Sequence, residues 1–95
     1  MKADLLLRKR IALSETAFVE MVVWHVPRPV RGSSHDFKYS LVLVADEICL
    51  IRYDTEAGKG DHKHLGDVEV AYKFVDLGQL DRDFWSDVEA WDKQR

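Results

Sequence analysis

Residues 37–54, FKYSLVLVADEICLIRYD, decide the fold of this chain. From Phe37 to Val44, side chains alternate between two faces with the period of two that a β-strand has. A second run of β-type residues, Ile48–Asp54, follows after the short segment Ala45–Glu47, which we expect to form a tight turn. The stretch therefore predicts a β-hairpin.

The segments on either side extend this hairpin into a sheet. Ala17–Val26 is rich in β-branched and aromatic residues and stops at Pro27, which cannot continue a central strand. We expect Leu5–Leu13 to be extended as well, although a helix is the alternative there. Val68–Val75 alternates again, and residues 27–36 form the longest loop.

The apolar period changes after residue 76. Apolar residues then recur at spacings of three and four, which is typical of one face of an α-helix, and Asp76 is a suitable N-cap. The stripe consists of Leu77, Leu80, Phe84, Val88 and Trp91. We expect one α+β domain over residues 1–95: an antiparallel meander of four or five strands within 1–75, with a C-terminal helix at about 77–92 packed on one face.

Composition limits the class of protein. With 46% hydrophobic and 33% charged residues, the chain reads as globular, and no apolar run approaches the roughly 18 residues of a membrane span. Cys49 is the only cysteine, so we expect no disulfide and no cysteine zinc site, and we place the protein in the cytoplasm. Net charge is −3, but residues 1–73 carry eleven basic and eleven acidic side chains, which is compatible with binding RNA.

Residues 52–64, RYDTEAGKGDHKH, hold most of the chemically useful side chains. Arg52 and Asp54 share one face of a strand, and in an extended chain His62 and His64 share a face with Lys63 opposite. If the two segments pair as a hairpin, the guanidinium, the carboxylate and both imidazoles converge.

Such a set suits RNA cleavage without a metal ion. We expect His62 and His64 to be the acid–base pair, because imidazoles exchange protons near neutral pH. Arg52 and Lys59 would be the cations that bind the phosphate and stabilise the transition state, and Asp54 would orient a histidine or Arg52. The substrate-binding candidates are Tyr53, Gly58, Gly60 and Lys63. We expect no metal and no cofactor.

Several plainer interpretations stay open. The histidines are solvated loop residues in one, and Arg52 with Asp54 is only an ion pair at a strand end in another; the GKG sequence lacks the spacing of a phosphate-binding P-loop. His62, His64 and Glu69 also match H-x-H-x₄-E, part of the first cupin motif, so a small metal-binding cupin-like barrel is a further alternative, although the flanking glycines of that motif are not at the expected positions. No histidine follows His64 to complete a second cupin motif.

Six segments that together extend over nearly the whole chain form a recognisable set: Arg52–Asp54, Gly58–His64, Tyr72–Phe74, Asp83–Val88, Phe18–Trp24 and Phe37–Tyr39. This set has a clear resemblance to the TumE-type toxin family of bacterial type II toxin–antitoxin modules. It implies a small intracellular toxin, encoded beside a helix-turn-helix antitoxin that neutralises it and represses the operon.

The resemblance supports a toxin more directly than it supports a ribonuclease. We expect an endoribonuclease acting on mRNA by analogy with toxins of this size. The alternative is a non-catalytic toxin or binding module that docks RNA or a protein target. No membrane partner is expected, and a homodimer stays open. Trp85 lies off the apolar helical stripe, which suggests an exposed residue at the antitoxin interface.

Overall fold

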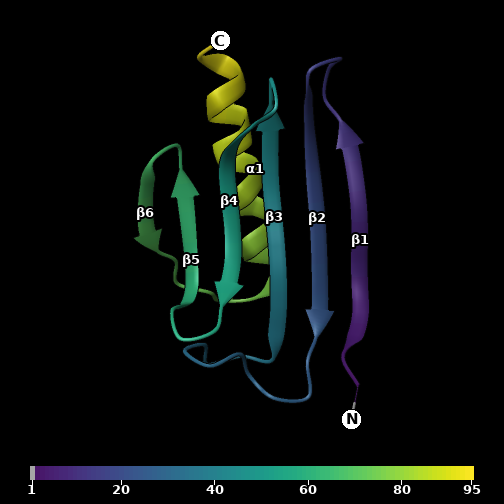
Figure 1. Cartoon of the computed structure of the whole chain (residues 1–95), viewed down its shortest axis with the longest axis vertical. Coiled ribbons are helices and arrows are strands. Elements are labelled where there is room, and N and C mark those ends of the chain that lie inside the picture. Colours follow the sequence, from purple (N-terminus) through teal and green to yellow (C-terminus); the bar gives the residue numbers. More distant parts are fainter. Residues whose placement is uncertain (1) are drawn as a thin grey trace.

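The structure, a computed structural model that describes residues 2–95, contains six strands and one helix (Figure 1). The strands are β1 (Asp4–Ala12), β2 (Ala17–His25), β3 (Phe37–Ala45), β4 (Ile48–Glu56), β5 (Gly60–Leu65) and β6 (Val68–Ala71), and the helix is α1 (Leu77–Lys93). The sheet order β1-β2-β3-β4-β5-β6 follows the sequence, and every neighbouring pair is antiparallel. The expected α+β meander is confirmed, with six strands instead of four or five.

The central hairpin forms where the sequence predicted it. Leu41 lies opposite Tyr53 across β3 and β4, and the strands are joined at Asp46 and Glu47. Both turn residues have left-handed backbone, with φ of 52° and 67°, respectively. That conformation matches the natural twist of a tight hairpin, and aspartate tolerates it better than most residues.

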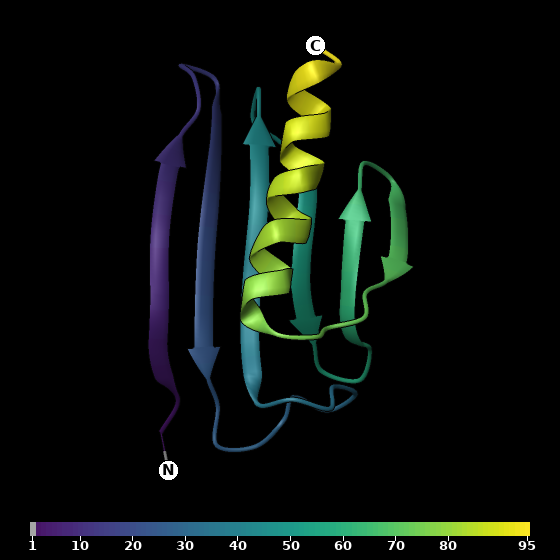
Figure 2. The same cartoon turned by 180° about the vertical axis from the view of Figure 1, so that it is seen from behind.

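The core lies between the sheet and α1, which crosses β3 and β4 on one face (Figure 2). One side chain in two along β2, β3 and β4 points into this layer, and α1 supplies Leu80, Phe84 and Val88. The helix begins where expected, because the Asp76 carboxylate accepts a hydrogen bond of 2.7 Å from the backbone N–H of Gln79.

The ends of the sheet differ in detail from the sequence prediction. The segment expected to be strand or helix at Leu5–Leu13 is the edge strand β1. The last strand ends at Ala71 instead of Val75, because the chain leaves the sheet edge to reach α1. On the way, the ring of Phe74 stacks on His35 with 3.9 Å between centroids, and the Tyr72 hydroxyl donates a 2.5 Å hydrogen bond to Asp83.

The face of the sheet away from α1 has no covering element within residues 2–95 (Figure 1). We name it the open face.

Trp85 of α1 is only half-exposed and packs edge-on against Phe84, with ring centroids 5.7 Å apart, so the expectation of an exposed tryptophan is wrong. Over residues 2–95, no helix combines the length and apolar character that crossing a membrane requires.

Candidate functional site: a histidine and carboxylate cluster on the open face

Pairing of β4 with β5 gathers four polar side chains on the open face. Asp54 lies directly opposite His62, and Arg52 lies directly opposite His64. Because strand residues two apart share a face, all four side chains point away from α1. We call Arg52, Asp54, His62 and His64 the open-face cluster; the convergence of the two segments expected from the sequence is therefore observed.

His62 is the buried member of the cluster. It is only 5% exposed, and its Nδ1 lies 3.2 Å from the carbonyl oxygen of Gly60, to which it donates a hydrogen bond. Its Nε2 points at Asp54 Oδ1, 2.9 Å away. The ring of His64 stands edge-on at 5.0 Å between centroids. Both nitrogen atoms of His62 are thus turned inward, away from any large substrate.

The contact between Asp54 and His62 is short but poorly aligned. Although the Oδ1 and Nε2 atoms are 2.9 Å apart, Asp54 Oδ1 is buried and makes no hydrogen bond within residues 2–95. We interpret the pair as a close electrostatic contact without hydrogen-bond geometry, because a hydrogen bond needs a suitable angle as well as a short distance. A buried carboxylate oxygen without a hydrogen bond is destabilising unless a positive charge lies close to it.

Further carboxylates surround the same imidazole nitrogen. Glu56 and Glu69 place oxygens 3.9 and 4.0 Å from His62 Nε2, respectively. Lys59 Nζ lies between these glutamates, 3.5 Å from Glu56 and 3.2 Å from Glu69. The hydrogen bond from Lys59 lowers the pKa of Glu69, and the same bond raises the pKa of Lys59. Lys59 is therefore held by carboxylates.

Arg52 and His64 form the accessible side of the cluster. Arg52 is exposed and His64 half-buried, and both line a shallow hollow with Cys49, Leu50, Ile51 and Gly66. Neither residue makes a salt bridge within the part of the chain that the structure describes, so the guanidinium there is available to an anion. A guanidinium can bind phosphate through a pair of hydrogen bonds.

Gly58 and Gly60 hold a neighbouring loop in place. Gly58 N–H donates a 2.7 Å hydrogen bond to the carbonyl of Arg31, and Gly60 touches Gly32. Gly60 has φ of +76°, and a Cβ at Gly32 would lie 2.7 Å from its nitrogen. Both glycines expected to bind substrate thus have a structural reason to be glycine, which is the close packing of loop 26–36 on the β4–β5 turn.

Tyr53 and Lys63 lie on the opposite face of the sheet from the open-face cluster. Tyr53 is fully buried, and its hydroxyl donates to the Asp87 carboxylate of α1. Lys63 Nζ lies 3.2 Å from that hydroxyl and 3.3 Å from Asp87. Burial and the bond to Asp87 raise the pKa of Tyr53. The structure therefore separates these two substrate-binding candidates from the histidines and ties them to the helix.

A second polar cluster escaped the sequence analysis. Asp61 is nearly buried on the helix side of the sheet and accepts three hydrogen bonds of 2.6 Å, from Ser33 Oγ, His35 Nε2 and the Tyr39 hydroxyl. His35 Nδ1 accepts from the backbone N–H of Phe37. The side-chain polar atoms of this cluster thus all have hydrogen-bond partners, and the cluster holds loop 26–36 against the sheet. No local sequence pattern reveals it, because its members are far apart in the chain.

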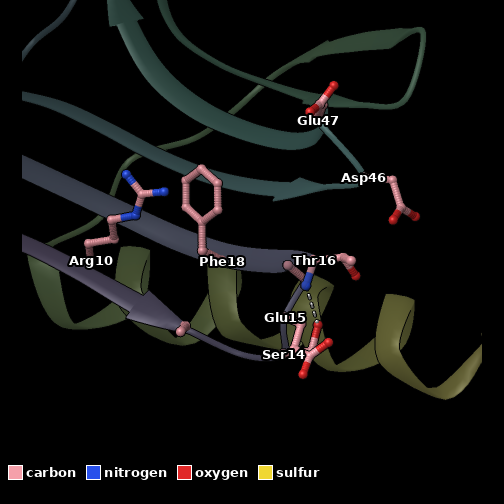
Figure 3. A pocket seen from close by; sticks show the side chains of 9 residues that line it. Arg10, Ser14, Glu15, Thr16, Phe18, Asp46 and Glu47 are labelled. Atoms are coloured by element: carbon pink, nitrogen blue, oxygen red, sulfur yellow. Dashed lines mark hydrogen bonds between the residues drawn. The ribbon is translucent and has the colours of Figure 1, made fainter.

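A wider hollow lies at the other end of the sheet, beside the β1–β2 and β3–β4 turns (Figure 3). Its carboxylates, Glu15, Asp46 and Glu47, point away from one another in Figure 3. The guanidinium of Arg10 lies over the ring of Phe18 at 3.8 Å. This hollow is larger than the one beside Arg52 and His64, but its polar groups do not converge, so the open-face cluster is the better candidate for the functional site.

The open-face cluster also offers donors for a metal ion. One ligand atom each from Asp54, His62 and His64 can be chosen so that all lie within 4.8 Å of one another. The cupin-like barrel considered from the sequence is wrong, because the sheet is open with β1 and β6 at its edges. The three possible metal ligands therefore lie on an open sheet and not inside a barrel.

The fold is that of a small α+β protein with an open antiparallel sheet, and a cluster of polar side chains lies on the uncovered face of that sheet. The model of the family Toxin TumE matches residues 2–92, and the chain belongs to this toxin family. The resemblance found in the sequence is thereby confirmed, and it suggests a cognate antitoxin as partner. Searches of curated proteins and of solved structures gave no match.

Proposed function

We propose that this toxin acts by cleaving RNA, with the open-face cluster as its active site. The observation that supports this most is the register of β4 and β5, which sets the free guanidinium of Arg52 opposite His64 and beside the Asp54–His62 pair. Phosphoryl chemistry needs a cation at the phosphate and a group that activates the attacking oxygen. The cluster contains both in one place.

In the proposed reaction, an oxygen nucleophile attacks the phosphorus of an RNA phosphodiester and the bond from phosphorus to the 5′-oxygen breaks. The nucleophile is the neighbouring 2′-hydroxyl or a water molecule. A group of the open-face cluster accepts the proton of this nucleophile, and the departing 5′-oxygen takes up a proton from solvent. Arg52 would hold the non-bridging phosphate oxygens, on which negative charge increases in the transition state.

Burial changes the roles expected from the sequence. Because His62 is 5% exposed and both its nitrogens face inward, it cannot touch RNA as a free acid or base. A relay of two substrate-contacting imidazoles is therefore less favoured than a cluster in which only His64 and Arg52 reach the substrate. Lys59 has a smaller share in phosphate binding, because Glu56 and Glu69 already engage its charge.

The test is cleavage of a defined RNA by the purified toxin, with new 5′ ends mapped. We expect His64→Ala and Arg52→Ala to lower the cleavage rate by at least about 100-fold, in line with the loss of a proton-transfer or charge-stabilising group. His25→Ala is the matched control, because His25 forms an ordinary exposed pair with Asp36 at 2.8 Å. Retarded RNA without new ends would instead favour the non-catalytic docking toxin.

The family also suggests a protein partner, a cognate antitoxin. For the antitoxin suggested by the family, we propose the helix-turn-helix type, and we expect it to reduce RNA cleavage when co-expressed. A toxin that cleaves mRNA acts in the cytoplasm. An unchanged cleavage rate in the presence of the antitoxin would contradict the partner proposal. Size-exclusion chromatography with light scattering decides whether the protein is a monomer or a homodimer.

A further inference from the structure

We propose that Asp54, His62 and His64 bind a divalent transition-metal ion of the zinc class. Two imidazole nitrogens and one carboxylate oxygen are a donor set typical of such ions, and hard cations such as Mg²⁺ prefer oxygen ligands alone. The inference concerns the site of the proposed function, and it rests on that function only for the use of the ion in RNA cleavage.

The first support is the orientation of His62. Its Nδ1–H donates to the backbone carbonyl of Gly60, which can only accept, so the lone pair of the neutral ring lies on Nε2. Metal-binding histidines commonly show this arrangement, in which a backbone carbonyl fixes the tautomer and aims the other nitrogen at the ion. Here the aimed nitrogen faces Asp54 Oδ1.

The second support is the carboxylate of Asp54, whose buried Oδ1 has no hydrogen-bond partner within residues 2–95. A neutral imidazole lone pair that faces a buried carboxylate oxygen at 2.9 Å is repulsive unless a positive charge lies between or beside them. A protonated His62 would satisfy the charge, but Asp54 Oδ1 makes no hydrogen bond within residues 2–95. A metal ion bonded to both atoms relieves the repulsion without any hydrogen-bond angle.

The third support is charge and spacing. Asp54, Glu56 and Glu69 each place a carboxylate oxygen within 4.0 Å of His62 Nε2, whereas Lys59 pairs only with Glu56 and Glu69, so the pocket attracts positive charge. A tetrahedral ion with bonds of about 2.0–2.1 Å keeps its ligand atoms roughly 3.3 Å apart. The donor atoms of the cluster, 2.9 Å apart at one pair and all within 4.8 Å, reach this spacing with small side-chain shifts.

A bound ion would also change the electrostatics of the active site. Three carboxylates close to the substrate repel phosphate, and an ion of charge +2 offsets most of that repulsion. Glu69, whose oxygen lies 4.0 Å from His62 Nε2, is close enough to serve as a further ligand. Arg52, which lies opposite His64 across β4 and β5, would then bind the same phosphate.

The experiment measures binding of Zn²⁺ alone to the untagged full chain after treatment with chelator, by competition with a chromophoric chelator. We expect one ion per chain, and the absorption of the Co²⁺ form should have tetrahedral intensity. His64→Ala and Asp54→Asn should weaken binding by at least about tenfold. His64 is half-exposed, so this variant is expected to fold, which circular dichroism checks.

Two controls make the result specific. His25→Ala removes the imidazole of a surface His–Asp pair of 2.8 Å and should leave Zn²⁺ affinity unchanged. Lys59→Ala should raise affinity several-fold, because it frees Glu56 and Glu69 from their cation. Stoichiometric binding that survives His64→Ala and Asp54→Asn, or no binding at all, would overturn the inference.

Failure of the inference can be told apart from failure of the proposed function. If the protein binds no Zn²⁺ in the competition experiment and still cleaves RNA in chelator, the metal site is overturned and the ribonuclease stands. Stoichiometric Zn²⁺ on the three residues without RNA cleavage supports the metal site and removes the ribonuclease. Cleavage lost in chelator and restored by Zn²⁺ supports both.

Discussion

Gly32 and Gly60 touch backbone to backbone, so that a Cβ on Gly32 would lie 2.7 Å from the nitrogen of Gly60. This contact joins loop 26–36 to the start of β5, one residue from Lys59 and two from His62. The position of the open-face cluster therefore depends on a loop that contributes none of the cluster's own residues.

The first prediction concerns Gly60. Gly60→Ala should lower the free energy of unfolding by about 3 kcal/mol, because alanine is strained at φ of +76° and its Cβ would run into the Gly32 backbone. Gly66→Ala is the matched control: it shares a positive φ, +62°, but has open space around it, so we expect a loss of about 1 kcal/mol. Urea denaturation measures both, and equal losses would show that the close approach contributes nothing.

A second prediction tests the fastening by Asp61. Asp61→Ala should cost about 3 kcal/mol or more, since Ser33, His35 and Tyr39 all lose their acceptor in a nearly buried position. Asp67→Ala, in the exposed β5–β6 turn, should stay within about 0.5 kcal/mol of the parent. The comparison is made by urea denaturation, and a stable Asp61→Ala protein would contradict the role given to this carboxylate.

The third prediction uses the tyrosines, all three of which have a raised pKa. Burial is the largest cause in each, followed by hydrogen bonds to Asp61 for Tyr39, to Asp87 for Tyr53 and to Asp83 for Tyr72. The folded form therefore holds these protons more tightly than the unfolded form, whose pKa is about 10. The stabilisation is complete below that pH and declines above it, by about 1.4 kcal/mol per pH unit for each fully buried phenol.

Ultraviolet absorbance of phenolate checks this directly, because the chain has only these three tyrosines. We expect no phenolate signal from the folded protein at pH 10 to 11, followed by one cooperative rise that coincides with loss of circular dichroism. Gradual ionisation at about pH 10 with the fold intact would show that the hydroxyls are not held as described.

The fourth prediction concerns the phosphate side of the active site. If Arg52 contacts an RNA phosphate, Arg52→Ala should lower the slope of log affinity against log salt by about one. Arg82→Ala is the control, because Arg82 lies on α1 and bonds to Gln79. Binding isotherms at several salt concentrations measure the slopes. Identical slopes for the parent and Arg52→Ala would place RNA elsewhere.

The sequence predicted what depends on local pattern. Alternation and turn residues located the β3–β4 hairpin, and the two-residue strand period was enough to bring Asp54 toward His62 once β4 and β5 pair. The same period already set Lys63 opposite the histidines, and its assignment to substrate overlooked that a lysine on the inner face would meet the acidic helix residue Asp87.

Contacts that depend on the path of a long loop were beyond such patterns. Asp61 and His35 meet because loop 26–36 folds back under the β4–β5 turn, and a loop path is set by many weak contacts at once. The burial of His62 likewise depends on contacts in three dimensions, a hydrogen bond to the Gly60 carbonyl and a close approach to Asp54, and no sequence pattern reveals it. The early end of β6 is also not visible in the local pattern: beyond Ala71 the chain leaves the sheet edge towards α1, and Phe74 stacks on His35 in that segment.

The meander has a consequence for how the chain emerges from the ribosome. Each strand pairs with the one made just before it, which favours rapid folding through short-range contacts. The segment that seals the apolar face, α1, is made after the last strand. Until α1 has been made and has packed on the sheet, the side chains of Val19, Leu41 and Leu43 lack the helix that covers them, so a chaperone can bind them during synthesis.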